Sequence, residues 1–332
     1  MLNNKSLLIT GGTGTLGKAL VERILKIYPN IGRLIIFSRD EQKQYEMSQK
    51  FSEIKFPAIR YFLGDVRDKN RLVRALKGVD YVIHTAAIKH VHISEYNPDE
   101  CIKTNIGGAE NLVSACLDSN VTGVVSLSTD KACAPINLYG ATKLTSDKLF
   151  VAANNFKGLN PIKFSVVRYG NVMGSKGSVV PFFVKKSKDG ILPITDKRMT
   201  RFNITLSESV DLVLFALKNA WGGEIFVPKI PSYNILDLAK AVCDKCKLET
   251  VGVRPGEKIH EEMISSSDSY STYDIGKYYV ILPYQFNWDF FKYKKLFNAI
   301  KVDDGFSYNS KENSRFLKID ELKTLINQIE SN

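Results

Sequence analysis

The sequence predicts an α/β protein with a doubly wound parallel sheet and a smaller C-terminal domain. Short apolar, β-branched runs alternate with longer segments whose apolar residues recur at helical spacing. The runs are continuously apolar, which is typical of parallel strands that helices cover on both faces. The length of 332 residues is enough for about two domains.

The predicted elements follow one another as strand, helix and strand. Helical spacing is clearest over residues 16–27 and 100–117, and residues 319–329 predict a final helix with one apolar face. The runs expected to be strands are residues 7–10, 34–38, 59–63, 81–85, 124–128 and 164–168.

The rhythm weakens beyond Gly170, where residues 174–178 indicate a loop. A helix over 207–219 and a strand over 224–227 are expected to rejoin the sheet. The expected first domain is residues 1–170 with 203–229, and the expected second domain is residues 171–202 with 230–332.

Composition limits the classes of partner. Lysine and arginine number 46 against 35 acidic residues, a net charge of +11 that suggests nucleic acid, an anionic membrane or a phosphorylated small molecule. The sequence contains no motif of basic and aromatic residues of the kind that recognises nucleic acid. Its apolar runs are all much shorter than the ~20 residues of a membrane span. We therefore expect neither a nucleic-acid nor a membrane partner.

The cysteines and the N-terminal residues predict a reduced, cytoplasmic protein. The N-terminal residues lack the features of a signal peptide, and the five cysteines are odd in number and scattered. Cys243 and Cys246 have Cys-x-x-Cys spacing, but no second pair or nearby histidine completes a zinc site. His90 and His92 likewise lack an evident third ligand, so no metal site is expected.

A glycine-rich turn follows the first predicted strand and opens the first helix. Its pattern is Gly-x-x-Gly-x-x-Gly, in which glycine permits a tight turn and a close approach of the backbone to a ligand. The free N–H groups at the helix start can bind a pyrophosphate. A dinucleotide site is therefore expected, with the turn residues Gly11, Thr13, Gly14, Thr15, Leu16 and Gly17 at the cofactor.

The end of the second strand bears on the choice between NAD and NADP. Ser38, Arg39 and Asp40 lie about 20 residues beyond the turn, where an NAD enzyme carries an acid for the ribose diol. Arg39 and Ser38, with Lys43 one helical turn further, favour a 2′-phosphate and hence NADP. Asp40 could instead bind the diol or cap the second helix.

Tyr139 and Lys143 form a Tyr-x-x-x-Lys pair. On a helix, residues i and i+4 share a face, so the ammonium can lower the pKa of the phenol and hold a ribose. Tyr273 and Lys277 have the same spacing, but Gly276 lies between them and they follow the predicted sheet. The first pair is therefore the candidate site, and the second is a chance match.

Three polar residues precede this pair at the end of the fifth strand. Thr129, Asp130 and Lys131 are expected at the carboxyl edge of the sheet, where doubly wound sheets bind ligands. In isolation, Asp130 and Lys131 would be read as an exposed ion pair. Beside Thr129 and Tyr139, they supply the acid and the base that an elimination requires.

Together these residues resemble the extended short-chain dehydrogenase/reductase superfamily, through the glycine-rich turn, Asp65-Val66, Ala86-Ala87, Asn105, Ser128-Thr129 and Tyr139 to Lys143. Within it, residues 5 to 283 are most similar to the inverting UDP-N-acetylglucosamine 4,6-dehydratases, which open pseudaminic acid and related pathways. The narrower resemblance rests on Ser38-Arg39-Asp40, Lys89-His90-Val91, Ser128 to Ala132, Arg168 to Val172, Met199 to Phe202 and Arg254 to Lys258. His92, Cys133 and Asn203 depart from the pattern of those enzymes.

The resemblance implies roles for further residues. The first domain becomes an NADP-binding Rossmann domain and the second a UDP-sugar-binding domain, in a homo-oligomer. At the cofactor it places Asp65, Val66, Ala86 and Lys89, besides the residues already named. At the nucleotide-sugar it places Lys89, Asn171, Gly177, Ser178, Val179, Val180 and Pro181, with Arg201, Arg254 and Glu257 at UDP. Glu261, Glu262 and the acids at 303–304 are expected to be solvated.

The expected chemistry begins with Tyr139, which removes the C4 hydroxyl proton as hydride passes to NADP+. Thr129 holds that hydroxyl, and Lys143 orients Tyr139 and the ribose. The ketone acidifies C5–H, which Lys131 abstracts if desolvation leaves it partly neutral. Asp130, if protonated, donates a proton to the departing C6 hydroxyl. Hydride returns to C6, and protonation of C5 from the opposite face inverts that centre.

Two other kinds of function stay open. A retaining dehydratase or a nucleotide-sugar 4-epimerase would use much of the same site, because Lys131 indicates dehydration more firmly than it fixes stereochemistry. A non-catalytic NADP-sensing Rossmann protein would need no proton path through Thr129, Tyr139 and Lys143.

Overall fold

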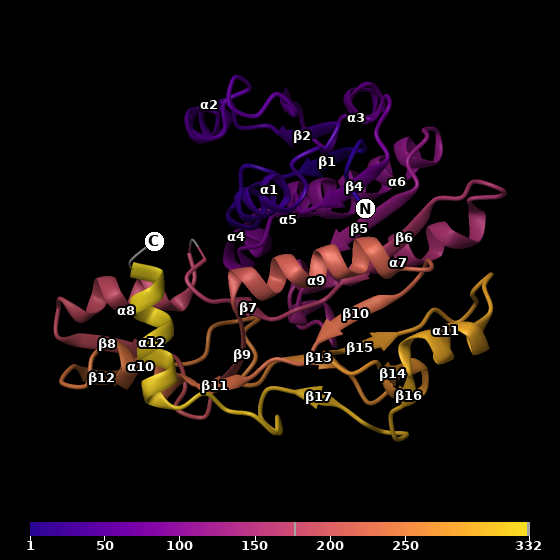
Figure 1. Cartoon of the computed structure of the whole chain (residues 1–332). Coiled ribbons are helices and arrows are strands. Elements are labelled where there is room, and N and C mark those ends of the chain that lie inside the picture. The colour runs from indigo at the N-terminus through magenta and orange to yellow at the C-terminus, as the bar shows by residue number, and fades with distance from the viewer. Residues whose placement is uncertain (176, 331–332) are drawn as a thin grey trace.

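The structure is a computed structural model that describes residues 1–175 and 177–330 (Figure 1). Its centre is a ten-stranded sheet in the order β16-β14-β15-β10-β6-β5-β4-β1-β2-β3. The strands from β3 to β10 run parallel, and those from β15 to β16 are antiparallel. The parallel strands are β1 (Ser6–Thr10), β2 (Arg33–Ser38), β3 (Ile59–Leu63), β4 (Tyr81–His84), β5 (Gly123–Leu127), β6 (Lys163–Val167) and β10 (Ile225–Pro228).

Helices cover both faces of the sheet, which explains why its strands are apolar throughout. On one face α1 packs against α9, and on the other α6 contacts both α3 and α7. The helices around the sheet are α1 (Thr15–Ile27), α2 (Glu41–Lys50), α3 (Lys69–Ala75), α4 (Val91–Tyr96), α5 (Pro98–Ile102), α6 (Gly108–Leu117), α7 (Leu138–Phe156) and α9 (Leu206–Asn219). The predicted fold class is confirmed.

The helix predicted over residues 100–117 is interrupted. A π-helical turn, η1 (Lys103–Gly107), separates α5 from α6. Asn105 in this turn is buried, and its amide donates to Ile88 O (2.9 Å) and to Thr142 Oγ1 (3.0 Å). The irregular turn therefore ties the loop after β4 to α7.

A second hydrophobic core lies at the lower left in Figure 1, to one side of the sheet. Phe183, Leu192, Leu238 and Leu322 are buried in it. Its elements are β7 (Asn171–Val172), α8 (Val179–Ser187), β8 (Ile191–Ile194), β9 (Thr200–Ile204), β11 (Ser232–Asn234), α10 (Ile235–Val242), β12 (Lys247–Thr250) and α12 (Ile319–Glu330). The predicted final helix thus packs into this smaller core, against α10.

The C-terminal third is divided between the two cores. As predicted, α9 and β10 belong to the large unit, but a hairpin beyond residue 230 also joins the sheet, because β15 pairs with the open edge of β10. The expected second domain therefore does not coincide with the sheet boundary. The strands and helices in this part are β13 (Glu262–Ile264), η3 (Asp268–Ser271), β14 (Thr272–Asp274), β15 (Tyr278–Ile281), α11 (Phe290–Phe297), β16 (Ile300–Lys301) and β17 (Tyr308–Asn309).

The cysteines correct one expectation. Cys243 and Cys246 form a disulfide, whereas reduced thiols were expected. The short connection between α10 and β12 brings their Cα atoms to 5.4 Å, which is within the span of a disulfide. Cys101, Cys116 and Cys133 are free and buried.

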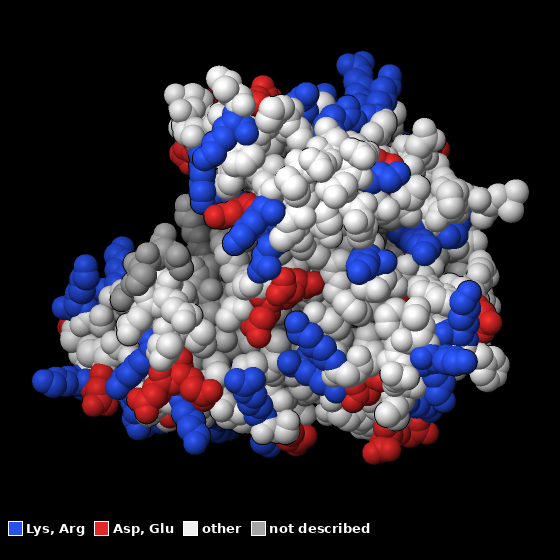
Figure 2. All heavy atoms as spheres, viewed as in Figure 1, with Lys and Arg blue, Asp and Glu red and all other residues white. Residues whose placement is uncertain are grey.

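The surplus of positive charge is spread out. On the face in Figure 2, lysine and arginine side chains lie over both units and alternate with acidic ones. Within residues 1–175 and 177–330, no helix is both long and apolar enough to span a membrane.

The expected loop at 174–178 includes residue 176, which lies outside the described residues. The described residues beside it are in neither a helix nor a strand.

We predict that Gly17→Ala destabilises the protein, because a Cβ on Gly17 would lie 2.4 Å from Gly12 O in the preceding turn. Overpacking of this kind costs about 1–3 kcal/mol. The measurement is the free energy of unfolding in urea. Gly107→Ala is the matched control, since its Cβ would meet open space. Equal stabilities for the two variants would contradict the prediction.

Candidate active site

The glycine-rich turn forms a cradle for a phosphate. Gly11 has φ +64°, and a Cβ there would lie 2.7 Å from Thr85 Oγ1 and 2.9 Å from the backbone of Ala86. No side chain accepts a hydrogen bond at the Gly14 N-cap of α1 within the described structure, so the first N–H groups of the helix are left for an anion. The turn therefore fits the pyrophosphate of a dinucleotide.

The residues predicted to select NADP have different surroundings. Ser38 is buried, with its hydroxyl 2.8 Å from that of Thr13. Asp40 caps α2 by accepting from Lys43 N (3.0 Å), and its carboxylate also pairs with the Lys43 ammonium. Arg39 is 59% exposed and 3.9 Å from Asp65. Asp40 thus acts as a cap, and Arg39 is the most accessible of these side chains.

Asp65 and Val66 lie at the end of β3, as expected. Although burial raises the pKa of Asp65, hydrogen bonds from Arg67 bring it below its usual value. The nearest of these side-chain contacts is 2.7 Å. Val66 is buried, and a Cβ on Gly108 would lie 2.7 Å from its Cγ2. Val66 therefore sets how closely α6 approaches this edge of the sheet.

The turn after β5 brings the predicted acid and base together. In η2 (Asp130–Ala132), Lys131 Nζ lies 3.1 Å from Asp130 Oδ1, and Thr129 Oγ1 donates to the same oxygen at 2.9 Å. Asp130 is only 1% exposed, and its second oxygen is 3.3 Å from where a Cβ on Gly170 would lie. Asp130 is therefore buried and Lys131 partly buried at 22% exposure, so the interpretation as an exposed ion pair is wrong.

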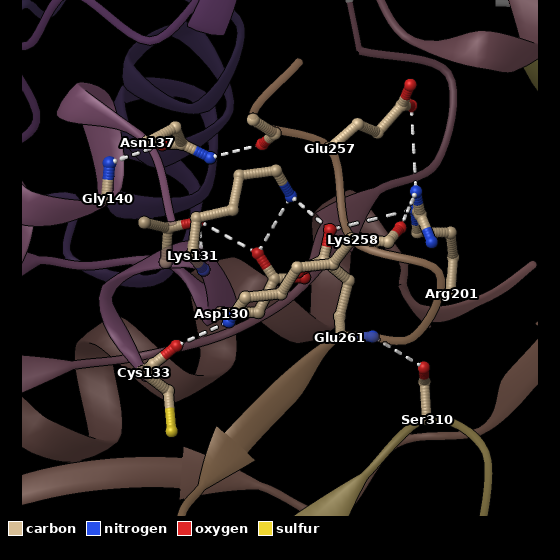
Figure 3. Close-up of polar contacts among 12 residues, drawn as sticks. Asp130, Lys131, Cys133, Asn137, Gly140, Arg201, Glu257, Lys258, Glu261 and Ser310 are labelled. Atoms are coloured by element: carbon tan, nitrogen blue, oxygen red, sulfur yellow. Dashed lines mark hydrogen bonds and ion pairs between the residues drawn. The ribbon is translucent and has the colours of Figure 1, made fainter. Parts of the chain in front are cut away.

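Glu261 is a member of this cluster that the sequence did not predict. It was expected to be solvated, yet it is 1% exposed and its Oε1 lies 3.0 Å from Lys131 Nζ (Figure 3). It reaches this position from the segment before β13, far along the chain from η2. The sequence gives no local signal for this position, because Glu261 and Glu262 are adjacent acids and only the structure shows that Glu261 is the buried one of the two.

The charges of this cluster determine the protonation states of Lys131 and Asp130, and for Lys131 the result differs from the expectation. Desolvation lowers the pKa of Lys131, but the negative charges of Asp130 and Glu261 outweigh it and raise the pKa above its ordinary value. Lys131 is therefore an ammonium in this state, not the partly neutral base that was expected. Burial raises the pKa of Asp130, against the effect of Lys131, so Asp130 is disposed to hold a proton.

Tyr139 lies on α7 beside this cluster and is 9% exposed. Burial raises its pKa to about 12, while the charge of Lys131 and a hydrogen bond with Thr129 act to lower it. The cation with the strongest effect on Tyr139 is thus Lys131, not Lys143 as expected. Burial lowers the pKa of Lys143, and Asp147, one turn further along α7, opposes that shift.

Asp147 is the centre of a second buried network. Ser128 Oγ donates to Asp147 Oδ2 at 2.6 Å, and Arg168 lies 3.3 Å from the same oxygen. Arg168 also donates to Met263 O (3.1 Å). The network therefore joins β5, β6, α7 and β13 directly behind the catalytic candidates.

Arg201, on β9, lies next to Glu261 of the cluster that Asp130, Lys131 and Glu261 form. It is buried, its Nε lies 3.7 Å from Glu261, and its other nitrogens contact the Glu257 carboxylate (3.6 Å) and the carbonyl oxygens of residues 200, 258 and 259. Each guanidinium nitrogen thus already faces an acceptor. The prediction that Arg201 holds UDP conflicts with this arrangement, whereas Arg254 is exposed.

Hydrogen bonds connect the turn over residues 254–258 to the segment between η2 and α7. Asn137 Nδ2 donates to Gly256 O (2.7 Å), and Lys258 Nζ donates to Cys133 O (2.6 Å), as Figure 3 shows. Asn137 also caps α7 by accepting from Gly140 N. One side chain therefore orients both the helix that carries Tyr139 and the turn that carries Arg254.

The remaining predicted sugar-binding residues lie around β7 and α8. Gly177 has φ +82°, and a Cβ there would lie 2.8 Å from the ring of His90, so this loop meets the segment that carries Lys89. Asn171 is hydrogen-bonded to Tyr233. Val180 belongs to the smaller core, which corrects its predicted contact with the sugar. Ser178, Val179 and Pro181 form the N-cap and the first turn of α8.

The second Tyr-x-x-x-Lys match does not have the geometry of the first. Tyr273 lies on β14 and Lys277 in the turn after it, so the two do not share a helix face. Within residues 1–175 and 177–330, no group of three or more His, Cys, Asp or Glu side chains could hold a metal ion.

The fold is that of a Rossmann-type α/β protein, and a cluster of acidic and basic side chains lies at the carboxyl edge of its parallel sheet. The chain belongs to the polysaccharide biosynthesis protein family, whose model matches residues 7–283. It is 53% identical, over 99% of both chains, to a Campylobacter jejuni protein named UDP-N-acetylglucosamine 4,6-dehydratase (inverting).

Two further comparisons cover nearly the whole chain. A Rickettsia canadensis protein named UDP-glucose 4-epimerase is 41% identical, over 98% of this chain and 96% of that one. The solved structure of Pen from Bacillus thuringiensis superposes with a TM-score of 0.89 at 35% identity, over 99% of both chains.

We predict that Asp147→Asn strongly destabilises the protein, because it removes the carboxylate that faces the buried Arg168. Breaking a buried ion pair in this way costs about 3–5 kcal/mol. The measurement is the midpoint of urea unfolding. Asp274→Asn, which breaks the half-exposed pair with Lys229, is the control and should cost at most about 1 kcal/mol. Similar losses from both variants would contradict the prediction.

Proposed function

We propose that the protein is an NADP-dependent hydro-lyase that converts UDP-N-acetylglucosamine to the UDP-4-keto-6-deoxy sugar with inversion at C5. The observation that carries the proposal is the buried cluster of Asp130, Lys131 and Glu261 beside Tyr139. Oxidation of an alcohol needs only the tyrosine, lysine and threonine. An additional buried acid and base are what the loss of water requires.

Three parts of the chain would hold the ligands. The cradle at Gly11 and the start of α1 would hold the cofactor pyrophosphate, and the exposed Arg39 would bind a 2′-phosphate. Arg254 is the exposed cation for the diphosphate of the substrate. When bound, the nicotinamide supplies reversible hydride transfer, from C4 of the sugar and back to C6, so that the net redox change is zero.

The chain supplies the proton transfers. Tyr139 takes the C4 hydroxyl proton, with Thr129 beside it to hold that hydroxyl. The 3.1 Å hydrogen bond from Lys131 to Asp130 lets one proton pass from the ammonium to the carboxylate. That single transfer creates a neutral amine and a neutral carboxylic acid, which are the base and the acid needed next.

The elimination then balances. The Lys131 amine takes the C5 proton, the C5–H electron pair forms the C5=C6 double bond, and the C6–O bond breaks. Asp130 donates its proton to the departing hydroxyl, which leaves as water. The pair thereby returns to an ammonium and a carboxylate. As hydride reaches C6, a water on the face opposite to Lys131 protonates C5 and inverts it, and the proton that Tyr139 took from the C4 hydroxyl passes to the hydroxide left behind, so that all groups return to their starting states.

The proposal includes the wider role implied by the resemblance: a first step of a pseudaminic acid-type pathway, in the cytoplasm. It also includes a homo-oligomer, for which exposed apolar side chains on and near α4 offer a surface, among them Tyr96 (87% exposed) and Ile136 (56% exposed). A retaining dehydratase or a 4-epimerase is the second candidate, which the similarity to a protein named UDP-glucose 4-epimerase favours. A non-catalytic NADP sensor would not require the buried acid and base.

We predict that incubation with NADP and UDP-N-acetylglucosamine in deuterated water gives a 4-keto-6-deoxy product with deuterium at C5 and inverted configuration. The measurement is NMR of the product. A C4 epimer that keeps its C6 hydroxyl would contradict dehydration. In the same assay, Lys131→Ala should still form NADPH transiently but lose no water, because the base is missing. Lys277→Ala, in the chance match, should behave as wild type.

The cofactor preference gives a separate prediction. Arg39→Ala should weaken NADP binding by about 10- to 100-fold, which corresponds to about 1.5–3 kcal/mol for a hydrogen bond to a charged group. NAD binding should be unchanged, because NAD lacks the 2′-phosphate. Titration of both cofactors by fluorescence or calorimetry measures the ratio. An equal loss for NAD and NADP would show that Arg39 does not read the 2′-phosphate.

A further inference from the structure

Glu261 comes from outside the parallel sheet, yet it completes the cluster at the carboxyl edge of that sheet. Its Oε1 lies 3.0 Å from Lys131 Nζ, while Asp130 Oδ1 lies 3.1 Å from the same nitrogen. Figure 3 shows the ammonium pointing between the two carboxyl groups. Lys131 therefore has a carboxylate partner that its own turn does not supply.

We propose that Glu261 is a positioning residue for dehydration: its carboxylate fixes the Lys131 amine beside Asp130 and sets the charge state of that pair. The inference rests on the proposed function, since it concerns the base and the acid of the elimination. Glu261 acts through Lys131 and is not itself required to touch the substrate.

The backbone at Glu261 is anchored so that its side chain keeps this position. Its N–H donates to Ser310 Oγ (2.9 Å), and Ser310 N donates to Glu261 O (2.8 Å). The Ser310 hydroxyl also lies 2.8 Å from that of Thr200, which contacts His260 Nδ1 at the same distance. Ser310, in the segment before α12, thus holds the backbone of Glu261 in position. Residues near 310 therefore help to orient the Glu261 side chain at the site.

The charges around Glu261 come from several elements. Burial raises the pKa of Glu261, but Lys131 and Arg201 outweigh it, so Glu261 stays ionised. The titratable groups that face the cluster are Asp130 and Lys131 from η2, Tyr139 from α7, Arg201 from β9, Tyr233 from β11, and Lys258 from the turn before Glu261.

The negative charge of Glu261 acts in the same direction on both members of the reacting pair. It raises the pKa of Lys131 and also the pKa of Asp130. Removing that charge therefore lowers both pKa values, and a pH profile that depends on both groups moves to lower pH. Loss of packing alone would reduce the height of the profile but leave its position unchanged.

The test is the pH profile of dehydration for Glu261→Gln, Glu261→Asp and Glu262→Gln. Glu261→Gln should shift the whole profile to lower pH by about one unit, in line with the effect of a charge at contact distance. Glu261→Asp keeps the charge one methylene further away and should give a smaller shift in the same direction. Glu262→Gln is the matched control, because the same charge is removed from the neighbouring residue, whose own electrostatic partners are Lys258, Cys133 and Asp268 and not Lys131 or Asp130.

The outcomes separate the two proposals. If wild-type enzyme loses no water from UDP-N-acetylglucosamine, the proposed function fails. If wild-type enzyme does dehydrate and the Glu261→Gln profile keeps its position, whatever its height, the positioning role of Glu261 is overturned. Unfolding midpoints check that the variants are folded; if the glutamine variant is not, the shift or constancy of the Glu261→Asp profile decides the question.

Discussion

The burial of one ammonium between two carboxyl groups is the interaction on which the site depends. An uncompensated charge at this depth would cost several kcal/mol, so the structure must hold Lys131, Asp130 and Glu261 together. Asp130 and Lys131 follow β5 of the large sheet, whereas Glu261 precedes β13. The cluster is thus also one of the electrostatic contacts that join the sheet to the C-terminal third of the chain, besides that of Arg168 with Asp268.

The same contact links structure to chemistry. A lone Lys131 in an apolar pocket would lose its proton readily, but here two carboxyl groups keep it charged. In the proposed mechanism the base is therefore produced by a proton transfer to Asp130, which burial favours as a neutral acid. Tyr139 is buried beside the pair, so oxidation and elimination can use one compact set of groups.

The structure divides the cations behind the positive net charge into three groups. Some of it is neutralised within the molecule, as for Arg201 against Glu257 and Glu261, and for Lys43 against Asp40. Arg39 and Arg254 stay accessible, and both belong to segments where the proposed function places phosphate. The remaining cations are spread among acids over the surface in Figure 2, which is unlike a continuous nucleic-acid-binding patch.

The sequence by itself determined the parallel sheet, the glycine cradle and the group Thr129, Asp130, Lys131, Tyr139 and Lys143, because each depends on local spacing within one strand–turn–helix unit. Only the tertiary structure decided three features of the site. These are the positive charge of Lys131, the acceptors that already face every guanidinium nitrogen of Arg201, and the position of Glu261 beside Lys131. These depend on residues more than fifty positions apart that meet when the C-terminal third packs against the sheet, and local spacing carries no information about such contacts. The hairpin of β14 and β15 joined the sheet for the same reason: it fills the edge of β10, which no local pattern marks as open.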